Sequence, residues 1–116
     1  MTRQPARPSA ALQHIVLLDF PVPLSAEEDS AMRDIVARWP DEVGLMSDLR
    51  FGADLTGERT RGYDYLLVTV FADAGDLARY VAHPVHQELV SFLDSRACRR
   101  LAFDYYLDAS THLVGR

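Results

Sequence analysis

The segment Tyr80–His86, with the sequence YVAHPVH, carries side chains that can take part in proton transfer. Histidine changes its charge near neutral pH, so His86 can act as a general base. A phenol such as Tyr80 can donate a hydrogen bond to an oxygen on which negative charge develops. In a dry pocket, these groups suit removal of a proton from carbon, as in an intramolecular aldol or Claisen ring closure.

Each of these side chains also has a purely structural interpretation. His83 precedes Pro84, which can open a helix at its first position, so His83 fits a helix cap. His86 and Tyr80 also fit partly buried core residues, and His14, in an earlier apolar segment, fits a packed strand residue. The spacing of His83 and His86 favours a metal site only weakly, because the proline interrupts the helix between them, and we expect no metal.

The composition of the chain excludes several other kinds of chemistry. All 12 basic residues are arginine, so no lysine can form a Schiff base with a substrate or with pyridoxal phosphate. Cys98 is the only cysteine, which excludes an intramolecular disulfide and a cysteine metal cluster. The sequence has neither a glycine-rich phosphate loop nor a GxSxG motif. We therefore expect an activity without a cofactor.

Length and charge indicate the class of protein. A chain of 116 residues, 48% hydrophobic and 25% charged, is typical of one globular domain. Its net charge of -5 makes nucleic acid and anionic membranes poor partners. No apolar run has the length of a signal peptide or a membrane span, and the lone cysteine suits a cytoplasmic protein.

The apolar pattern predicts strands and helices in the order β-α-β-β-α-α-β. Strands are expected at residues 12–20, 45–55, 63–71 and 100–107. Helices are expected after Ser25, which forms a capping box with Glu28, after Asp73, and from Pro84 onward, with Pro40 ending the first helix. This order is typical of an α+β, ferredoxin-like fold with an antiparallel sheet. We expect this domain at residues 11–108, between a flexible N-terminal tail at 1–10 and a C-terminal tail at 109–116.

Both faces of the predicted sheet are apolar, although helices cover only one of them. We expect the uncovered face to carry alternate residues of the first and third strands, namely His14, Val16, Leu18, Tyr65 and Leu67. Because an apolar patch of this size rarely faces water, a second copy of the chain is expected to cover it in a symmetric homodimer. So short a chain cannot easily enclose a large ligand alone, which indicates a site shared between subunits.

Four segments stand out by their order and spacing: HIVLLDF, GYDYLLVTVF, YVAHPVHQELV and LAFDYYL. Together they resemble the stress-responsive A/B barrel (Dabb) family over residues 12–107. The resemblance implies a ferredoxin-like monomer that forms a dimeric α+β barrel. The family includes polyketide cyclases of the olivetolic acid type, which close a linear tetraketide by an aldol reaction without a cofactor.

The resemblance also implies roles for individual residues. Tyr80 and His86 correspond to catalytic residues of those cyclases, and Asp104 corresponds to the aspartate that orients the histidine. The substrate-binding positions that follow are His14, Val16, Met32, Val36, Tyr65 and Leu67. Met32, Val36 and Tyr65 stand where the cyclases have other residues, so a different substrate is expected.

We therefore expect a homodimeric, cofactor-independent enzyme that acts on a small polyketide-like molecule, with His86 as general base. Two alternatives are open: a cofactor-free oxygenase, and a non-enzymatic, stress-responsive oligomeric barrel. An open cavity reached by Tyr80, His86 and His14 favours an enzyme, whereas a filled interior favours the scaffold.

Overall fold

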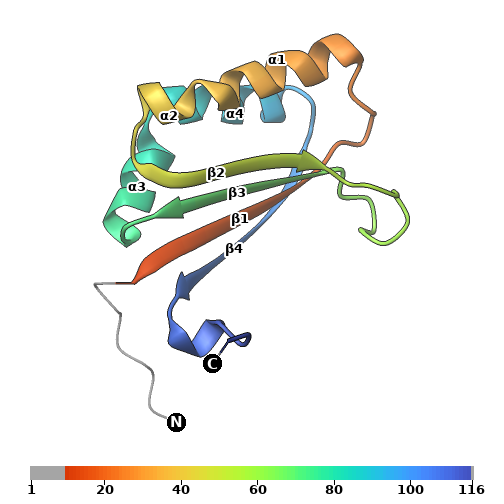
Figure 1. The fold of residues 1–116 in the computed structure, drawn as a ribbon. Helices are drawn as coiled ribbons and strands as arrows, with labels where there is room; N and C mark the ends of the chain where they lie inside the picture. The colour runs from red at the N-terminus through yellow and green to blue at the C-terminus, as the bar shows by residue number, and fades with distance from the viewer. Residues whose placement is uncertain (1–9, 116) are drawn as a thin grey trace.

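The computed structural model describes residues 10–115, which form a four-stranded antiparallel sheet with helices on one face (Figure 1). The strands are β1 (Ala11–Asp19), β2 (Met46–Ala53), β3 (Tyr65–Phe71) and β4 (Arg99–Leu107). The helices are α1 (Ala26–Ala37), α2 (Trp39–Glu42), α3 (Ala74–Ala82), α4 (Pro84–Asp94) and the short 3₁₀ helix η1 (Ala109–Thr111). The predicted α+β, ferredoxin-like fold is confirmed. The N-terminal tail predicted at 1–10 lies, except for its last residue, outside the described residues.

The strand order is β2-β3-β1-β4, so β1 pairs with both β3 and β4. Its register with β4 places His14 directly opposite Asp104 and Leu18 directly opposite Arg100. Side chains opposite each other on neighbouring antiparallel strands point to the same face, with Cβ atoms about 5 Å apart. The register therefore determines which β4 side chains His14 can reach.

The first helix begins at the predicted cap. The Ser25 hydroxyl accepts a hydrogen bond from the Glu28 N–H (3.1 Å), and the Glu28 carboxylate accepts one from the Ser25 N–H (2.9 Å). Helix α1 ends at Ala37, and Pro40 lies in the first turn of α2, a helix that we did not predict. Proline fits there because the first turn of a helix does not need the missing N–H. The extra turn places Trp39 in the core.

His83 separates α3 from α4 and caps α4, as predicted. Its backbone is extended, with φ -68° and ψ 137°, and its Nδ1 accepts a hydrogen bond from the Val85 N–H (3.1 Å). Pro84 disfavours the helical conformation at His83 and opens the next helix. The break brings Tyr80, near the end of α3, and His86, near the start of α4, within 4.4 Å between ring centroids.

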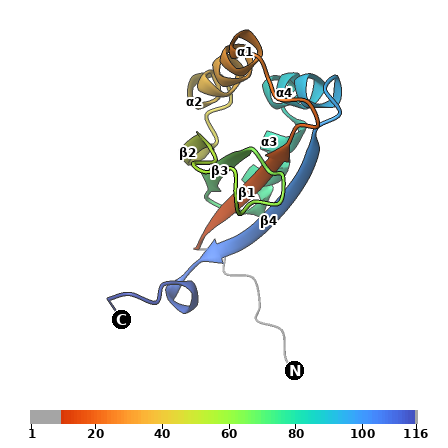
Figure 2. The ribbon, with the colours of Figure 1, turned by 90° about the vertical axis from the view of Figure 1, so that its right-hand side faces the viewer.

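The helices cover the face of the sheet that we expected a second subunit to cover, so that prediction was wrong. His14, Leu18 and Leu67 lie beneath them, and Figure 2 shows the helices together on one side of the sheet. Strand alternation separates the two faces but does not tell which one the helices cover. The open face instead carries exposed apolar side chains of β3 and β4: Leu66, Leu101, Phe103 and Leu107.

The predicted C-terminal tail contains η1. The Asp108 carboxylate accepts a hydrogen bond from the Ser110 N–H (2.8 Å), and the Thr111 hydroxyl donates to the Tyr106 carbonyl (3.2 Å). These bonds hold η1 at the end of β4.

Candidate active site

A cavity of about 240 Å³ lies between the sheet and the helices α3 and α4. Its walls are mostly apolar side chains, Val16 and Leu67 among them, which suits a ligand with an apolar part. The polar or charged side chains that line it are His14, Tyr80, His86 and Arg100. An open cavity reached by two histidines and a tyrosine is the arrangement that favours an enzyme over a packed scaffold.

His14 and Asp104 form a hydrogen-bonded pair between β1 and β4. Nδ1 of His14 contacts Oδ1 of Asp104, and the His14 side chain is 11% exposed, against 44% for Asp104. Because the carboxylate accepts, the proton of the neutral ring lies on Nδ1 and the lone pair lies on Nε2. The prediction that Asp104 orients His86 is therefore corrected. His86 lies on α4, whereas His14 faces Asp104 in the strand register.

Tyr80 lies in an aromatic cluster beside the cavity. Its ring centroid is 4.9 Å from that of Phe71, 5.2 Å from that of Trp39 and 4.4 Å from that of His86. The hydroxyl is buried and has no hydrogen-bond partner among the described residues. Burial raises the pKa of Tyr80 far above its ordinary value of 10, so the phenol keeps its proton. Such an unpaired donor is costly unless a ligand oxygen pairs with it.

His86 is partly buried, and its orientation follows from the break between α3 and α4. Its Nδ1 is 3.0 Å from the carbonyl oxygen of Val81. That carbonyl can accept side-chain donors, His86 and the Gln87 amide (2.8 Å), because its usual helical donor, the Val85 N–H, bonds to His83 instead. The proton of His86 therefore lies on Nδ1, and Nε2 is the acceptor. Burial lowers the pKa of His86 below its ordinary value of 6.5, which favours the neutral ring at pH 7.

The structure brings together some of the predicted substrate contacts and separates others. His14, Val16 and Leu67, which we expected to contact substrate, line the cavity. Met32 and Val36, by contrast, are buried in the hydrophobic core, with 0% and 3% exposure, and do not form the cavity wall. Both point from α1 toward the sheet, where tight packing leaves no room for a ligand.

Several cavity residues were missed in the sequence. Leu89 and Leu93 of α4 face the cavity, and Arg100 and Ala102 of β4 line its other side. The four-residue spacing of Leu89 and Leu93 marks one face of a helix, and Arg100 and Ala102 share a strand face with Asp104. These spacings are visible in the sequence, but the sequence does not show the strand order that places these residues beside the cavity.

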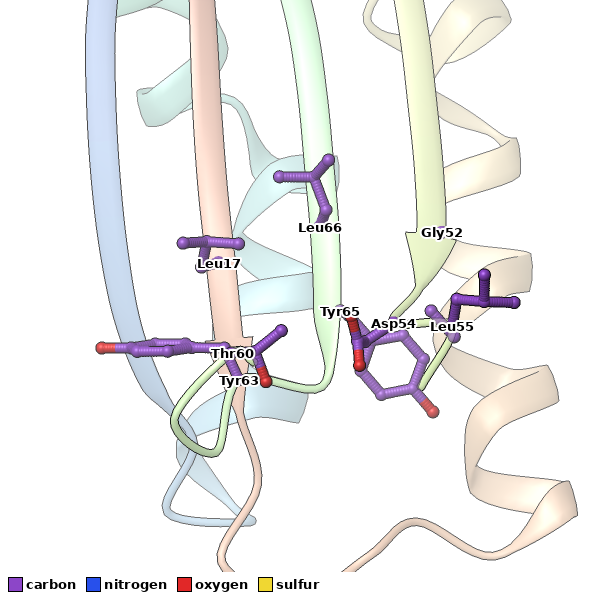
Figure 3. A pocket seen from close by; sticks show the side chains of 9 residues that line it. Leu17, Gly52, Asp54, Leu55, Thr60, Tyr63, Tyr65 and Leu66 are labelled. Atoms are coloured by element: carbon purple, nitrogen blue, oxygen red, sulfur yellow. The ribbon is translucent and has the colours of Figure 1, made fainter. Parts of the chain in front are cut away.

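Tyr65 lies beside a second cavity of about 290 Å³, at the ends of β1 and β3 (Figure 3). Leu17, Tyr63 and Leu66 also line it. The Tyr65 hydroxyl donates to Oδ2 of Asp29 (2.5 Å), and burial together with this bond raises the pKa of Tyr65 to about 12. The described residues that line this cavity include no histidine, so it lacks the general base that the first cavity has.

Within residues 10–115, His, Cys, Asp and Glu side chains form no group of three or more that could hold a metal ion. His83 and His86 serve different backbone groups: Nδ1 of His83 caps α4, and Nδ1 of His86 bonds to Val81. No helix in this part of the chain is both long and apolar enough to cross a membrane.

Residues 12–107 match the model of the stress-responsive A/B barrel domain, which covers most of the chain. The chain belongs to this family. The resemblance seen in the sequence is thereby confirmed. No curated protein matches the chain.

Solved structures share the fold of this chain. The hydroxynitrile lyase from Passiflora edulis superimposes with a TM-score of 0.75 at 17% identity, over 88% of this chain and 97% of that one. A dimeric ferredoxin-like protein from Thermobifida fusca gives 0.73 at 21% identity, over 85% and 92%. A protein from Arabidopsis thaliana gives 0.71 at 27% identity, over 88% and 99%. The fold therefore occurs both in a dimeric protein and in a lyase.

Proposed function

We propose that this A/B barrel protein is a cofactor-independent enzyme that removes a proton from carbon and then makes or breaks a carbon–carbon bond, as a cyclase or lyase does. One observation carries the proposal: His14, which Asp104 holds by a hydrogen bond, His86, and Tyr80, whose hydroxyl has no partner among the described residues, line one mostly apolar cavity. A base and a neutral hydrogen-bond donor beside an apolar wall are what enolate chemistry requires.

His14 is the general base in this proposal. Its Nε2 takes a proton from the carbon beside a substrate carbonyl, and the electron pair of the C–H bond becomes the enolate. Asp104 holds the ring by Nδ1 and stabilises the imidazolium that forms. In a cyclase the enolate carbon then attacks a second carbonyl of the same molecule, forming the C–C bond, and the proton on His14 passes to the new alkoxide.

Tyr80 is the donor to the oxygen on which charge develops. Its pKa, raised by burial, keeps it protonated, so it can stabilise an enolate without being ionised by solvent. His86, 4.4 Å from Tyr80 between ring centroids, offers Nε2 as a second neutral acceptor. Nδ1 of His86 contacts only a backbone carbonyl, whereas Nδ1 of His14 contacts a carboxylate that can stabilise the imidazolium, which is why we place the first proton transfer at His14.

The proposal places a polyketide-like molecule in the cavity, because an apolar wall beside enolate chemistry suits a chain of alternating methylene and carbonyl groups. The hydroxynitrile lyase of the same fold suggests a second probe, a cyanohydrin. Turnover of a linear poly-β-keto acid and of mandelonitrile by the wild-type protein, His14→Gln and Tyr80→Phe tests the assignment. We expect a loss of about 10²–10⁴ in kcat for His14→Gln.

Asp48→Asn is a matched control, because it removes a carboxylate from an exposed ion pair on β2, away from the cavity. It should keep full activity. If neither probe reacts faster with the wild-type protein than in buffer alone, the proposed cyclase activity and the proposed cyanohydrin cleavage are both wrong. If His14→Gln is as fast as the wild type, the role of His14 fails although the activity stands.

The same proposal includes a homodimer. The open face of the sheet carries Phe103, which is 64% exposed, and Leu101, which is 51% exposed. These side chains would be shielded if a second copy packed on this face, with the helices of both copies outward. The ferredoxin-like protein of the same fold from Thermobifida fusca is described as dimeric, which supports a dimer but does not identify the face.

A further inference from the structure

Arg100 differs from the other groups that line the active-site cavity. Among the described residues of its wall, it is the only arginine, and a guanidinium is a permanently charged group. An arginine beside apolar walls recognises a carboxylate well, because its planar fork can make two parallel hydrogen bonds.

Within the protein, Arg100 pairs with Asp94, and this ion pair is weak. Nη2 of Arg100 contacts Oδ1 of Asp94, but the Asp94 side chain is 59% exposed and the Arg100 side chain is 33% exposed. Exposed ion pairs contribute little to stability, because solvent screens them and two flexible side chains must be ordered. A ligand carboxylate can therefore replace Asp94 at low cost.

The strand register sets the distance between Arg100 and the proposed base. Arg100 is opposite Leu18, and Asp104 is opposite His14, so the two positions are four residue steps apart along β4. At roughly 3.3 Å per residue, the two ends of the cavity are about 13 Å apart along the strand. The wall between them is formed by Val16 of β1 and Ala102 of β4, both apolar.

We propose that Arg100 binds an anionic group, a carboxylate, at one end of the substrate, while the reacting carbon lies at the other end beside His14. The substrate is then an elongated, apolar keto acid rather than a neutral ketone. This inference rests on the proposed function, because it takes the cavity to be the substrate site. The field of Arg100 also reaches His86, whose pKa it helps to lower, which agrees with its position at the cavity.

Binding of two probes of equal length tests the inference without requiring turnover. Octanoate and octanamide are titrated into the protein at pH 7 and followed by calorimetry and by the imidazole NMR signals of His86. The wild-type protein should bind octanoate about tenfold more tightly than octanamide, as expected for a charge-assisted bidentate contact. Arg100→Gln should reduce this ratio to about one and leave the affinity for octanamide unchanged.

Arg99→Gln is the matched control. It removes the neighbouring arginine, which points to the other face of β4, pairs with Asp19 and does not line the cavity. Arg99→Gln should keep the tenfold ratio, and Asp94→Asn should raise the affinity for octanoate by freeing Arg100. The inference is overturned if the wild-type protein does not bind octanoate or binds both probes equally, or if Arg100→Gln keeps the preference. An octanoate preference without any turnover would count against the proposed function alone, and turnover without the preference would count against the inference alone.

Discussion

Nδ1 of His14 and Oδ1 of Asp104 are hydrogen-bonded across two neighbouring strands, on the face of the sheet that the helices cover. Both side chains come from regular strands rather than from loops. A pair held on strands is positioned more precisely than one held on loops. The bond also fixes the tautomer of His14, so that Nε2 is the nitrogen able to take a proton.

Asp104→Asn should lower kcat about tenfold or more with little change in KM. The amide can still bond to Nδ1, but it no longer stabilises the imidazolium that forms when His14 takes a proton. Steady-state kinetics on the substrate that the wild-type protein turns over provides the measurement. An unchanged kcat would show that the pair is structural.

Tyr80→Phe should separate stability from activity. Removing a buried hydroxyl that has no partner should raise the free energy of unfolding by roughly 1 kcal/mol, while kcat falls about 10²-fold because the enolate loses its donor. Thr69→Val is the matched control, because it removes another buried, unpaired hydroxyl that does not line the cavity. It should stabilise the fold in urea unfolding and leave kcat unchanged. If Tyr80→Phe is destabilising, its hydroxyl has a structural partner.

His86 should make stability depend on pH. Its pKa in the folded protein is below 6.5, so between that pKa and 6.5 the unfolded chain binds more protons than the folded one. Stability from this group is therefore complete above pH 6.5 and falls as the pH decreases through this window. NMR titration of His86 in the folded protein and in urea measures both pKa values. A folded pKa equal to or above that in urea contradicts the burial of His86.

His83→Ala should cost about 1 kcal/mol of stability without lowering kcat. The substitution removes the ring nitrogen that accepts from the Val85 N–H and caps α4. His83→Asn, a good capping residue, should recover most of the loss. Urea unfolding of the three proteins checks this, and a large loss of activity in His83→Asn would mean that His83 does more than cap the helix.

Phe103→Asp should convert the proposed dimer into a monomer. The substitution places a charge on the exposed apolar face of the sheet, where a second copy would have to bury it. Val22→Asp, at a site that is also exposed but precedes α1, is the control and should leave the dimer intact. Light scattering after size-exclusion chromatography gives the mass. A dimer of Phe103→Asp as stable as that of the wild type would place the interface elsewhere.

The elements of the fold could be predicted because the signals are local. Ser25 with Glu28, and His83 with Pro84, are patterns a few residues long, and the structure uses both as caps. The alternation along β1 likewise separates His14 from Ile15 without any knowledge of the rest of the chain.

The partner of Asp104 could not be predicted in this way, because it depends on strand order. Asp104 contacts His14 only because β4 pairs with β1. These two strands are far apart in the sequence, so local patterns do not reveal that they pair. The same reason explains why the covered face was assigned wrongly and why Arg100 was missed. Local patterns placed Tyr80 and His86 beside the break, but not the sheet residues opposite them.

The central claim is that His14 removes a proton from carbon, and hydrogen–deuterium exchange measures that step without the natural substrate. 7-Oxooctanoate, a keto acid, is incubated with the protein in D₂O, and the loss of the signals next to its ketone carbonyl is followed by proton NMR. The wild-type protein should accelerate exchange over buffer, and His14→Gln should reduce the acceleration by about 10²-fold or more. Exchange no faster than in buffer, or equally fast in His14→Gln, would contradict the account.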